Sequence, residues 1–215
     1  MNKQLSSLRS KNLGFDKENV VYIHTYGKLH NKKELEYLKT SLLKNPDILS
    51  IAFRGNIPTE WQGGRPLSKN PDNKNIVAME RISVDEDYFN LMKIHFIEGE
   101  NIFSHSSDTM NYCILNKRAA EVLGIKPPYT EKVVYSPLEN NKPFTIKGIV
   151  QNVNSKALTQ QVDPCFYMKA KQYSDNGILL FKISNDYPKA IKAIKSFCEE
   201  KNPGFTFEYQ FLDEV

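Results

Sequence analysis

The 215 residues of the chain have a mass of 24.8 kDa, enough for one large domain or two small ones with a buried core. Hydrophobic residues make up 40% of the sequence, and 12 Phe and 11 Tyr supply more burial than a disordered chain carries. The net charge is only +4 and the few Arg are scattered, which argues against the concentrated basic face of a nucleic-acid-binding protein.

The longest apolar runs, such as Ile178-Leu179-Leu180-Phe181, are far shorter than the roughly 20 residues that a bilayer-spanning helix needs. Met1 to Ser10 is too polar for a secretory leader. We therefore expect either a cytosolic chain or a piece of a longer one.

The first quarter of the chain predicts a βαβ-like unit. Val20 to Thr25 has the pattern of a strand, and Asn31 with Glu34 three residues later resembles a capping box that opens a helix. The apolar positions of this helix lie on one face: Leu35, Leu38, Leu42 and Leu43. Asn45-Pro46 ends the helix, and Ile48 to Phe53 predicts the next strand.

A segment without periodicity follows from Gly55 to Asn75, and loops of that length are usually functional or mobile. It contains the only tryptophan, Trp61. This side chain either pins the loop to the core or marks a contact surface, because Trp is enriched at binding hot spots. On the second interpretation, Trp61, Gln62 and Arg65 are candidate contacts for a partner or a substrate.

The middle of the chain is rich in predicted strands, which cover residues 76–84, 94–97, 112–115, 132–135, 144–153 and 164–169. The run Asp85-Glu86-Asp87 predicts the start of a short helix, with acidic residues at the positive end of its dipole. A second helix is expected between an Asn116 cap and Gly124, which stands at a left-handed capping position.

The end of the chain repeats the pattern of its beginning. Residues 178–184 predict a strand, Asp186 and Pro188 predict a helix start, and aromatic residues alternate with polar ones over 205–211. Two such halves around a strand-rich middle predict an α+β fold with a discontinuous domain. Residues 1–81 and 171–215 form that domain, and 82–170 are inserted as a second subdomain.

The sequence lacks the usual catalytic and metal-binding signatures. The four histidines never stand at HxxxH or HExxH spacing, no P-loop or GxSxG motif occurs, and Gly63-Gly64 is too short to cradle a phosphate. We interpret Asp85-Glu86-Asp87 as helix capping rather than a metal cluster. Cys113, Cys165 and Cys198 are expected as small buried hydrophobic residues, with one disulfide left open. No cofactor, metal or catalytic residue is therefore predicted.

The order of several short motifs resembles the MacB-like periplasmic core domain of ABC transporter permeases, in the style found in Bacteroidetes. The motifs are Leu13-Gly14-Phe15-Asp16, Val84-Asp85-Glu86-Asp87-Tyr88-Phe89, Ile97-Glu98-Gly99-Glu100-Asn101-Ile102-Phe103, Ile114-Leu115-Asn116-Lys117-Arg118-Ala119-Ala120 and Phe207-Glu208-Tyr209-Gln210-Phe211-Leu212-Asp213. The resemblance implies a porter-like βαβ-repeat subdomain made from the two chain ends, with an inserted Sabre-like subdomain. It also implies a place between the first and second transmembrane helices of a permease, with both termini on the same side.

The function implied by the resemblance is that of a non-catalytic extracytoplasmic domain on the periplasmic side of the inner membrane. Such a domain couples cytoplasmic ATP hydrolysis to the export or extraction of a substrate. Its implied partners are an ATP-binding subunit acting through the transmembrane helices and a second permease copy or core domain. A substrate peptide, lipoprotein or small molecule is a further implied partner. A ligand- or peptide-sensing domain is the alternative, motivated by the Trp61 loop, and a cytosolic enzyme of unfamiliar type is a third.

Overall fold

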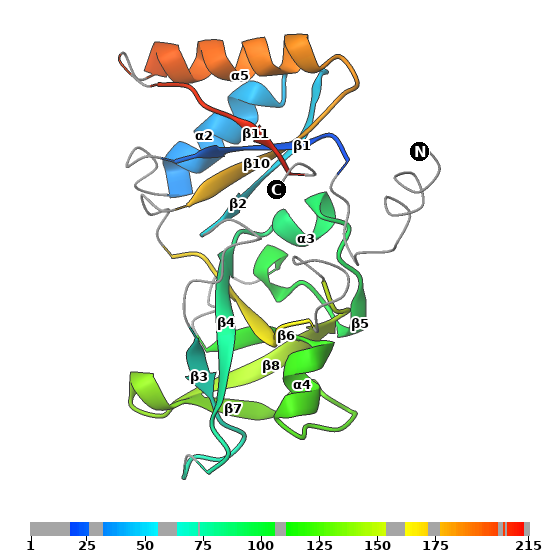
Figure 1. Ribbon diagram of the computed structural model, residues 1–215, viewed down its shortest axis with the longest axis vertical. Helices are drawn as coiled ribbons and strands as arrows, with labels where there is room; N and C mark the ends of the chain where they lie inside the picture. The colour runs from blue at the N-terminus through cyan, green and yellow to red at the C-terminus, as the bar shows by residue number, and fades with distance from the viewer. Residues whose placement is uncertain are drawn as a thin grey trace, which may run out of the picture.

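The computed structural model describes residues 18–25, 32–55, 64–72, 74–105, 111–153, 162–171, 177–201, 204 and 206–212 (Figure 1). The helices are α2 (Lys32–Leu42), α3 (Tyr88–Leu91), α4 (Lys117–Val122) and α5 (Tyr187–Lys201), with 3₁₀ turns η1 (Ile102–Ser104) and η2 (Pro137–Glu139). The strands are β1 (Val20–His24), β2 (Ile48–Arg54), β3 (Arg65–Leu67), β4 (Val77–Val84), β5 (Phe96–Gly99), β6 (Tyr112–Asn116), β7 (Val133–Ser136), β8 (Lys142–Val150), β9 (Cys165–Lys169), β10 (Ile178–Ile183) and β11 (Gln210–Phe211).

The two capping signals around α4 act as the sequence predicts, whereas Asn31, the predicted start of the first helix, lies outside the described residues. Asn116 precedes α4 in an extended conformation, and its Oδ1 accepts a hydrogen bond from the Ala119 N–H at 2.8 Å. Gly124 follows the helix with a φ of +64°, the left-handed conformation that glycine adopts at little cost. The predicted mixed α+β character of the fold is confirmed by these helices and by the mixed sheet of 11 strands that the described residues form.

Three predicted segments differ from the structure. The segment expected to be a loop contains β3, because Arg65 to Leu67 pair with Val77 to Met79 of β4. Among its described residues, the aromatic alternation near the C-terminus gives a two-residue strand, and Phe207 packs against the hydrophobic cluster formed by α2, α5 and the end strands. Strand β5 lies two residues later than predicted and includes Gly99, where a Cβ would stand 2.1 Å from the Lys147 carbonyl oxygen.

The two ends of the chain interleave in one antiparallel group of strands, the end sheet, with the order β11-β1-β10-β2. Strand β10 lies between β1 and β2, and β1 lies between β10 and β11, so each βαβ-like unit is split by a strand of the other. This is the ferredoxin-like arrangement of two split βαβ units. Helices α2 and α5 cover one face of the end sheet and bury Leu35, Leu38 and Ile194 against it (Figure 1).

The middle of the chain forms a closed ring of strands. The pairings run β3-β4-β9-β6-β8-β7, and Ser68 pairs with Tyr135 to join the segments of β7 and β3. All six strands contribute to one hydrophobic cluster, which therefore lies inside the ring; Ala119 and Ala120 of α4 add to it. Strand β5 extends this group by pairing with β8. We call these elements the strand ring.

The end sheet and the strand ring share a second hydrophobic cluster. Among the described residues, their strands are joined by one pair, Arg54 of β2 with Val84 of β4. Helix α3 lies between the two groups (Figure 1) and places Tyr88 and Phe89 in a cluster that takes residues from both of them. We call this cluster the shared core. The division at residues 81/82 and 170/171 stays a prediction.

We predict that Phe89→Ala lowers the free energy of unfolding by about 3–5 kcal/mol, because the aromatic side chain fills the shared core. Urea unfolding followed by NMR should show that amides of β1 and β6 still unfold together. The control, Leu138→Ala, changes an exposed side chain and should cost less than about 0.5 kcal/mol. Separate transitions for β1 and β6 in the unsubstituted protein would contradict a shared core.

Candidate functional site at the junction of the two strand groups

Of the three candidate contact residues, only Arg65 lies within the described residues. It is the first residue of β3, and its side chain is exposed. Trp61 and Gln62 lie outside the described residues, so a contact role for these side chains stays a prediction. The ligand-sensing alternative, which depends on the same loop, stays a prediction as well.

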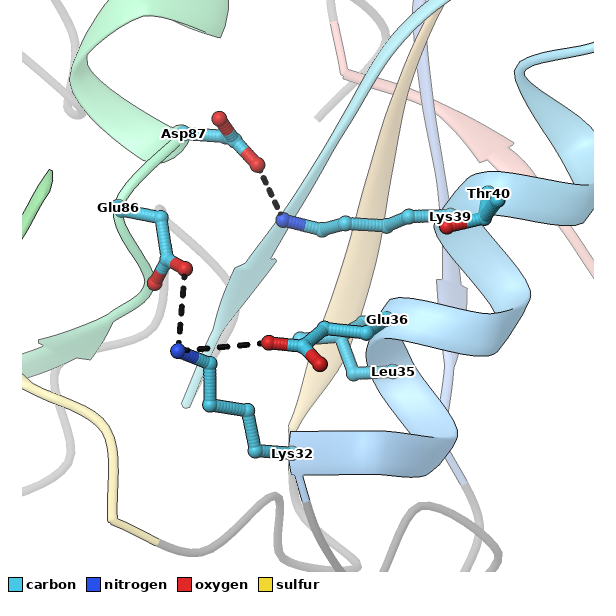
Figure 2. Close-up of a pocket in the computed structure, with 7 residues that line it drawn as sticks. All are labelled: Lys32, Leu35, Glu36, Lys39, Thr40, Glu86 and Asp87. Atoms are coloured by element: carbon cyan, nitrogen blue, oxygen red, sulfur yellow. Dashed lines mark hydrogen bonds and ion pairs between the residues drawn. The ribbon is translucent and has the colours of Figure 1, made fainter.

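The structure gathers charged side chains at another place, where α2 meets the turn between β4 and α3 (Figure 2). Helix α2 contributes two lysines, the turn contributes three carboxylates, and β9 contributes a third lysine. We call this set the junction cluster: Lys32, Lys39, Asp85, Glu86, Asp87 and Lys169. It connects the end sheet to the strand ring beside the shared core.

Lys39 is the central cation of the junction cluster. Its Nζ lies 2.7 Å from Oδ2 of Asp85 and 2.5 Å from Oδ2 of Asp87. Lys32 lies two turns before Lys39 on the same side of α2, and its Nζ is 3.6 Å from Oε1 of Glu86. Figure 2 shows this contact. Glu86 also lies 3.9 Å from Lys169 of β9. The cluster therefore ties α2 to the turn before α3 by two separate lysines.

Asp85 is almost completely buried, with 1% of its side chain exposed. Its Oδ2 also accepts a hydrogen bond from the Phe53 N–H at 2.7 Å, and its Oδ1 accepts one from the Asp87 N–H at 3.2 Å. The Asp85 N–H donates to the Phe53 carbonyl oxygen at 3.3 Å, so Asp85 binds both the backbone N–H and the backbone C=O of Phe53. Asp85 thus fixes the register of β2 against the turn.

The acidic run was predicted to cap α3, and this interpretation is wrong for Asp87. Asp87 directly precedes the described residues of α3 but makes no side-chain cap hydrogen bond to them. The physical reason is that its carboxylate and that of Asp85 converge on the ammonium of Lys39, a stronger charge-assisted partner than a backbone amide.

The pKa values of Asp85 and Lys39 reflect burial first and then the convergence of two carboxylates on one ammonium. Burial raises the pKa of Asp85 to about 6, and the neighbouring Asp87 adds to the shift, while Lys39 and the Phe53 N–H oppose it only in part. Burial by itself would lower the pKa of Lys39, but the two carboxylates outweigh it and the net shift is upward. Both pKa values are raised, so Asp85 and Lys39 each bind a proton more tightly in the folded protein than in water.

A second set of buried polar side chains lies at the shared core and is centred on Arg54. Arg54 of β2, with 4% of its side chain exposed, lies 3.2 Å from Oε1 of Glu80 on β4. Its Nη1 donates to the hydroxyl oxygen of Tyr88 on α3 at 3.1 Å. Burial raises the pKa of Tyr88, so the phenol is neutral at pH 7. Three elements are therefore joined by one buried guanidinium.

A cavity of about 170 Å³ opens beside the junction cluster, lined by Lys32, Leu35, Glu36, Lys39, Thr40, Glu86 and Asp87 (Figure 2). Ligand pockets usually have volumes of about 300–1,000 Å³. Two of the dashed contacts in Figure 2, Lys39–Asp87 and Lys32–Glu86, join α2 to the turn, and the third, Lys32–Glu36, lies within α2. The arrangement is suited to holding two elements together.

The thiols of the described residues are free and poorly reactive. Burial raises the pKa of Cys113 and of Cys165 to about 12 and that of Cys198 to about 11, so none is a thiolate at pH 7. Within the described part of the chain, no group of three His, Cys, Asp or Glu residues is placed to hold a metal ion.

Sequence reasoning identified the acidic run but missed its partners. Lys39 is 46 residues away from Asp85 in sequence, on a helix whose polar positions all look solvent-exposed. The pairing of Arg54 with Glu80 could have been predicted, because both are charged residues in or next to strand-like apolar runs. Charged residues are almost never fully buried unless they are paired.

Neither the protein-family models nor the curated protein sequences give a match to the amino-acid sequence. Solved structures do match its fold. The periplasmic region of MacB from Actinobacillus actinomycetemcomitans has 16% identity and a TM-score of 0.64, with 97% of this chain and 95% of that chain covered.

Two further structures match over similar lengths. A domain of a putative permease protein from Porphyromonas gingivalis has 9% identity and a TM-score of 0.60, with 91% of this chain and 90% of that chain covered. The extracellular domain of the noncanonic ABC-type transporter YknZ from Gram-positive bacteria has 12% identity and a TM-score of 0.59, with 89% and 97% covered. The predicted resemblance to the MacB-like core domain is thus confirmed as a likeness of fold.

None of the described helices is both long and apolar enough to span a bilayer.

The buried pair of Arg54 and Glu80 gives a double-mutant prediction. Glu80→Leu should lower the free energy of unfolding by about 3–5 kcal/mol, because it leaves a buried guanidinium without its carboxylate. The double variant Arg54→Met with Glu80→Leu should cost clearly less than the sum of the two single changes, since both charges are gone. Urea unfolding measures all four proteins, and additive costs would show that the pair is not coupled.

Lys39 and Lys32 provide a matched pair on α2. Lys39→Met should cost about 3 kcal/mol or more at pH 7.5, because Asp85 then stays buried without an ammonium. Lys32→Met removes an exposed pair and should cost less than about 1 kcal/mol. At pH 5 the loss for Lys39→Met should shrink, since a neutral Asp85 needs no cation. Equal losses at pH 5 and 7.5, measured by urea unfolding, would contradict this role of Lys39.

Proposed function

We propose that the chain is an extracytoplasmic domain of an ABC-type transporter permease of the MacB type. The observation that carries the proposal is the likeness of fold over nearly the whole length of both chains, to three domains of permeases or transporters. The charged residues of the junction cluster pair among themselves, and Arg54 pairs with Glu80 at the shared core. This arrangement suits a domain that transmits movement between its two groups of strands.

In this proposal the domain transmits displacement without making or breaking bonds. Helix movements that follow ATP hydrolysis on a cytoplasmic subunit enter through the ends of the chain. Packed cores resist continuous deformation, so a displacement of the end sheet is passed on to the strand ring as a unit. The shared core and the junction cluster supply the connection between the two groups of strands.

The proposed layout assigns residues 1–81 and 171–215 to a porter-like part and 82–170 to an inserted, Sabre-like part. The pairing of β1 with β11 supports it, because the first and last described strands lie side by side. The proposed partners are the ATP-binding subunit, reached through the transmembrane helices, and a second permease copy or core domain. The transported substrate is a peptide, a lipoprotein or a small molecule.

The proposal predicts that the domain faces the outside of the cytoplasmic membrane. In the full-length protein, Leu138→Cys places a thiol at a position that is 63% exposed on η2, and Cys198→Ser removes the half-buried native thiol. A membrane-impermeant maleimide should label this variant in cells whose inner membrane is intact. The protein with Cys198→Ser alone is the control, because Cys113 and Cys165 are buried and should stay unlabelled.

Labelling that requires lysis of the inner membrane would contradict the proposed location. Purification of the full-length protein in mild detergent should also retain an ATP-binding subunit, identified by mass spectrometry and by ATP hydrolysis. A protein with external labelling but without such a subunit would be extracytoplasmic and not part of an ABC transporter.

A further inference from the structure

We propose that the junction cluster is a proton-operated latch: closing α2 onto the turn before α3 takes up a proton at Asp85, so acidification holds the end sheet and the strand ring together more firmly. This inference goes beyond the proposed function and does not depend on it. A latch of this kind operates in any larger protein that contains the domain.

The geometry around Asp85 supplies the first argument. The carboxyl group lies between two elements, with Lys39 of α2 on one side and the Phe53 N–H of β2 on the other. Asp87 shares the same lysine, so two carboxylates compete for one ammonium. A proton on the buried carboxyl of Asp85 relieves this excess of negative charge, whereas the side chain of Asp87 is half-exposed and hydrated.

The other charged groups near Asp85 include cations that have acidic partners of their own. The groups that face it or its neighbours are Lys39, Lys32 and Glu36 on α2, Glu86 and Asp87 in the turn, Lys169 on β9, and Arg54 on β2 with Glu80 on β4. Lys32 and Lys169 contact Glu86, and Arg54 contacts Glu80 and the Tyr88 hydroxyl. Lys39 contacts Asp85 directly, with its Nζ 2.7 Å from Oδ2.

The direction of the pH effect follows from the two states of Asp85. In the closed junction burial raises its pKa to about 6, while in an open, hydrated junction the pKa returns to the usual value of about 4. Because the closed state binds the proton more tightly, the latch is strongest below pH 4 and weakens as the pH rises through 6. From these two values, opening should be about tenfold more favourable at pH 7.5 than at pH 5.

Native-state hydrogen exchange tests the proposal on the unsubstituted protein. The reporters are the amides of Phe53, which donates to Asp85, and Leu91, which donates to the Asp87 carbonyl oxygen. Their protection factors, which correct for intrinsic exchange, should be about tenfold higher at pH 5 than at pH 7.5. The amide of Tyr135, which donates to Ser68 within the strand ring, should show no such change. Carbon-13 NMR of the Asp85 carboxyl should give a midpoint near 6.

Three variants separate the titration of Asp85 from that of other groups. Asp85→Asn should abolish the difference in protection between the two pH values, because the amide cannot titrate. Asp72→Asn, which changes an exposed carboxylate in another turn, should leave it intact. Lys39→Gln should move the Asp85 midpoint to higher pH, since the stabilising ammonium is lost.

Three results would overturn the latch. The first is an Asp85 midpoint near 4 in the unsubstituted protein, a measurement that needs no variant to fold. The second is equal protection of Phe53 and Leu91 at the two pH values. The third is an equal pH response at Tyr135, which would mean that the proton is taken up on global folding and not on closing the junction.

Discussion

The structure depends on one hydrophobic cluster that neither strand group can complete alone. One face of the end sheet contributes Val20, Ala52 and Leu180, and the strand ring contributes Ile82, Ile114 and Tyr167 from the sides of its strands that face outward. Helix α3 fills the space between them with two aromatic side chains. The strand ladder between the groups is short, with one residue pair among the described residues, so side-chain packing supplies most of their connection.

The polar residues at the junction are a consequence of that packing. Wherever a charged group enters the shared core it requires a partner, because an unpaired charge in a low-dielectric interior is costly. Arg54 therefore has Glu80 and Tyr88, and Asp85 has Lys39. Helix α2 contributes both to the packing and to the charge pairing. Its leucines pack against the end sheet, and its lysines reach the turn before α3.

The interleaving of the chain ends gives the proposed transmission its physical basis. Because β10 separates β1 from β2, and β1 separates β10 from β11, a force on either end of the chain acts on strands of both βαβ-like units. The closed strand ring has its own interior cluster and can follow as one body. A proton at Asp85 would then change how firmly the two bodies are connected, without altering either of them.

The sequence by itself determined the local elements, because their signals lie within a few residues: the Asn116 cap, the Gly124 turn and the leucine face of α2 are all readable from neighbours in the chain. It also determined the order of motifs by which the fold was identified. Only the tertiary structure decided that the strands near the two ends interleave, that Arg65 begins a strand, and that Lys39 meets Asp85. These pairings join residues far apart in the chain, and such contacts are set by the packing of whole faces and leave no periodic pattern in the sequence.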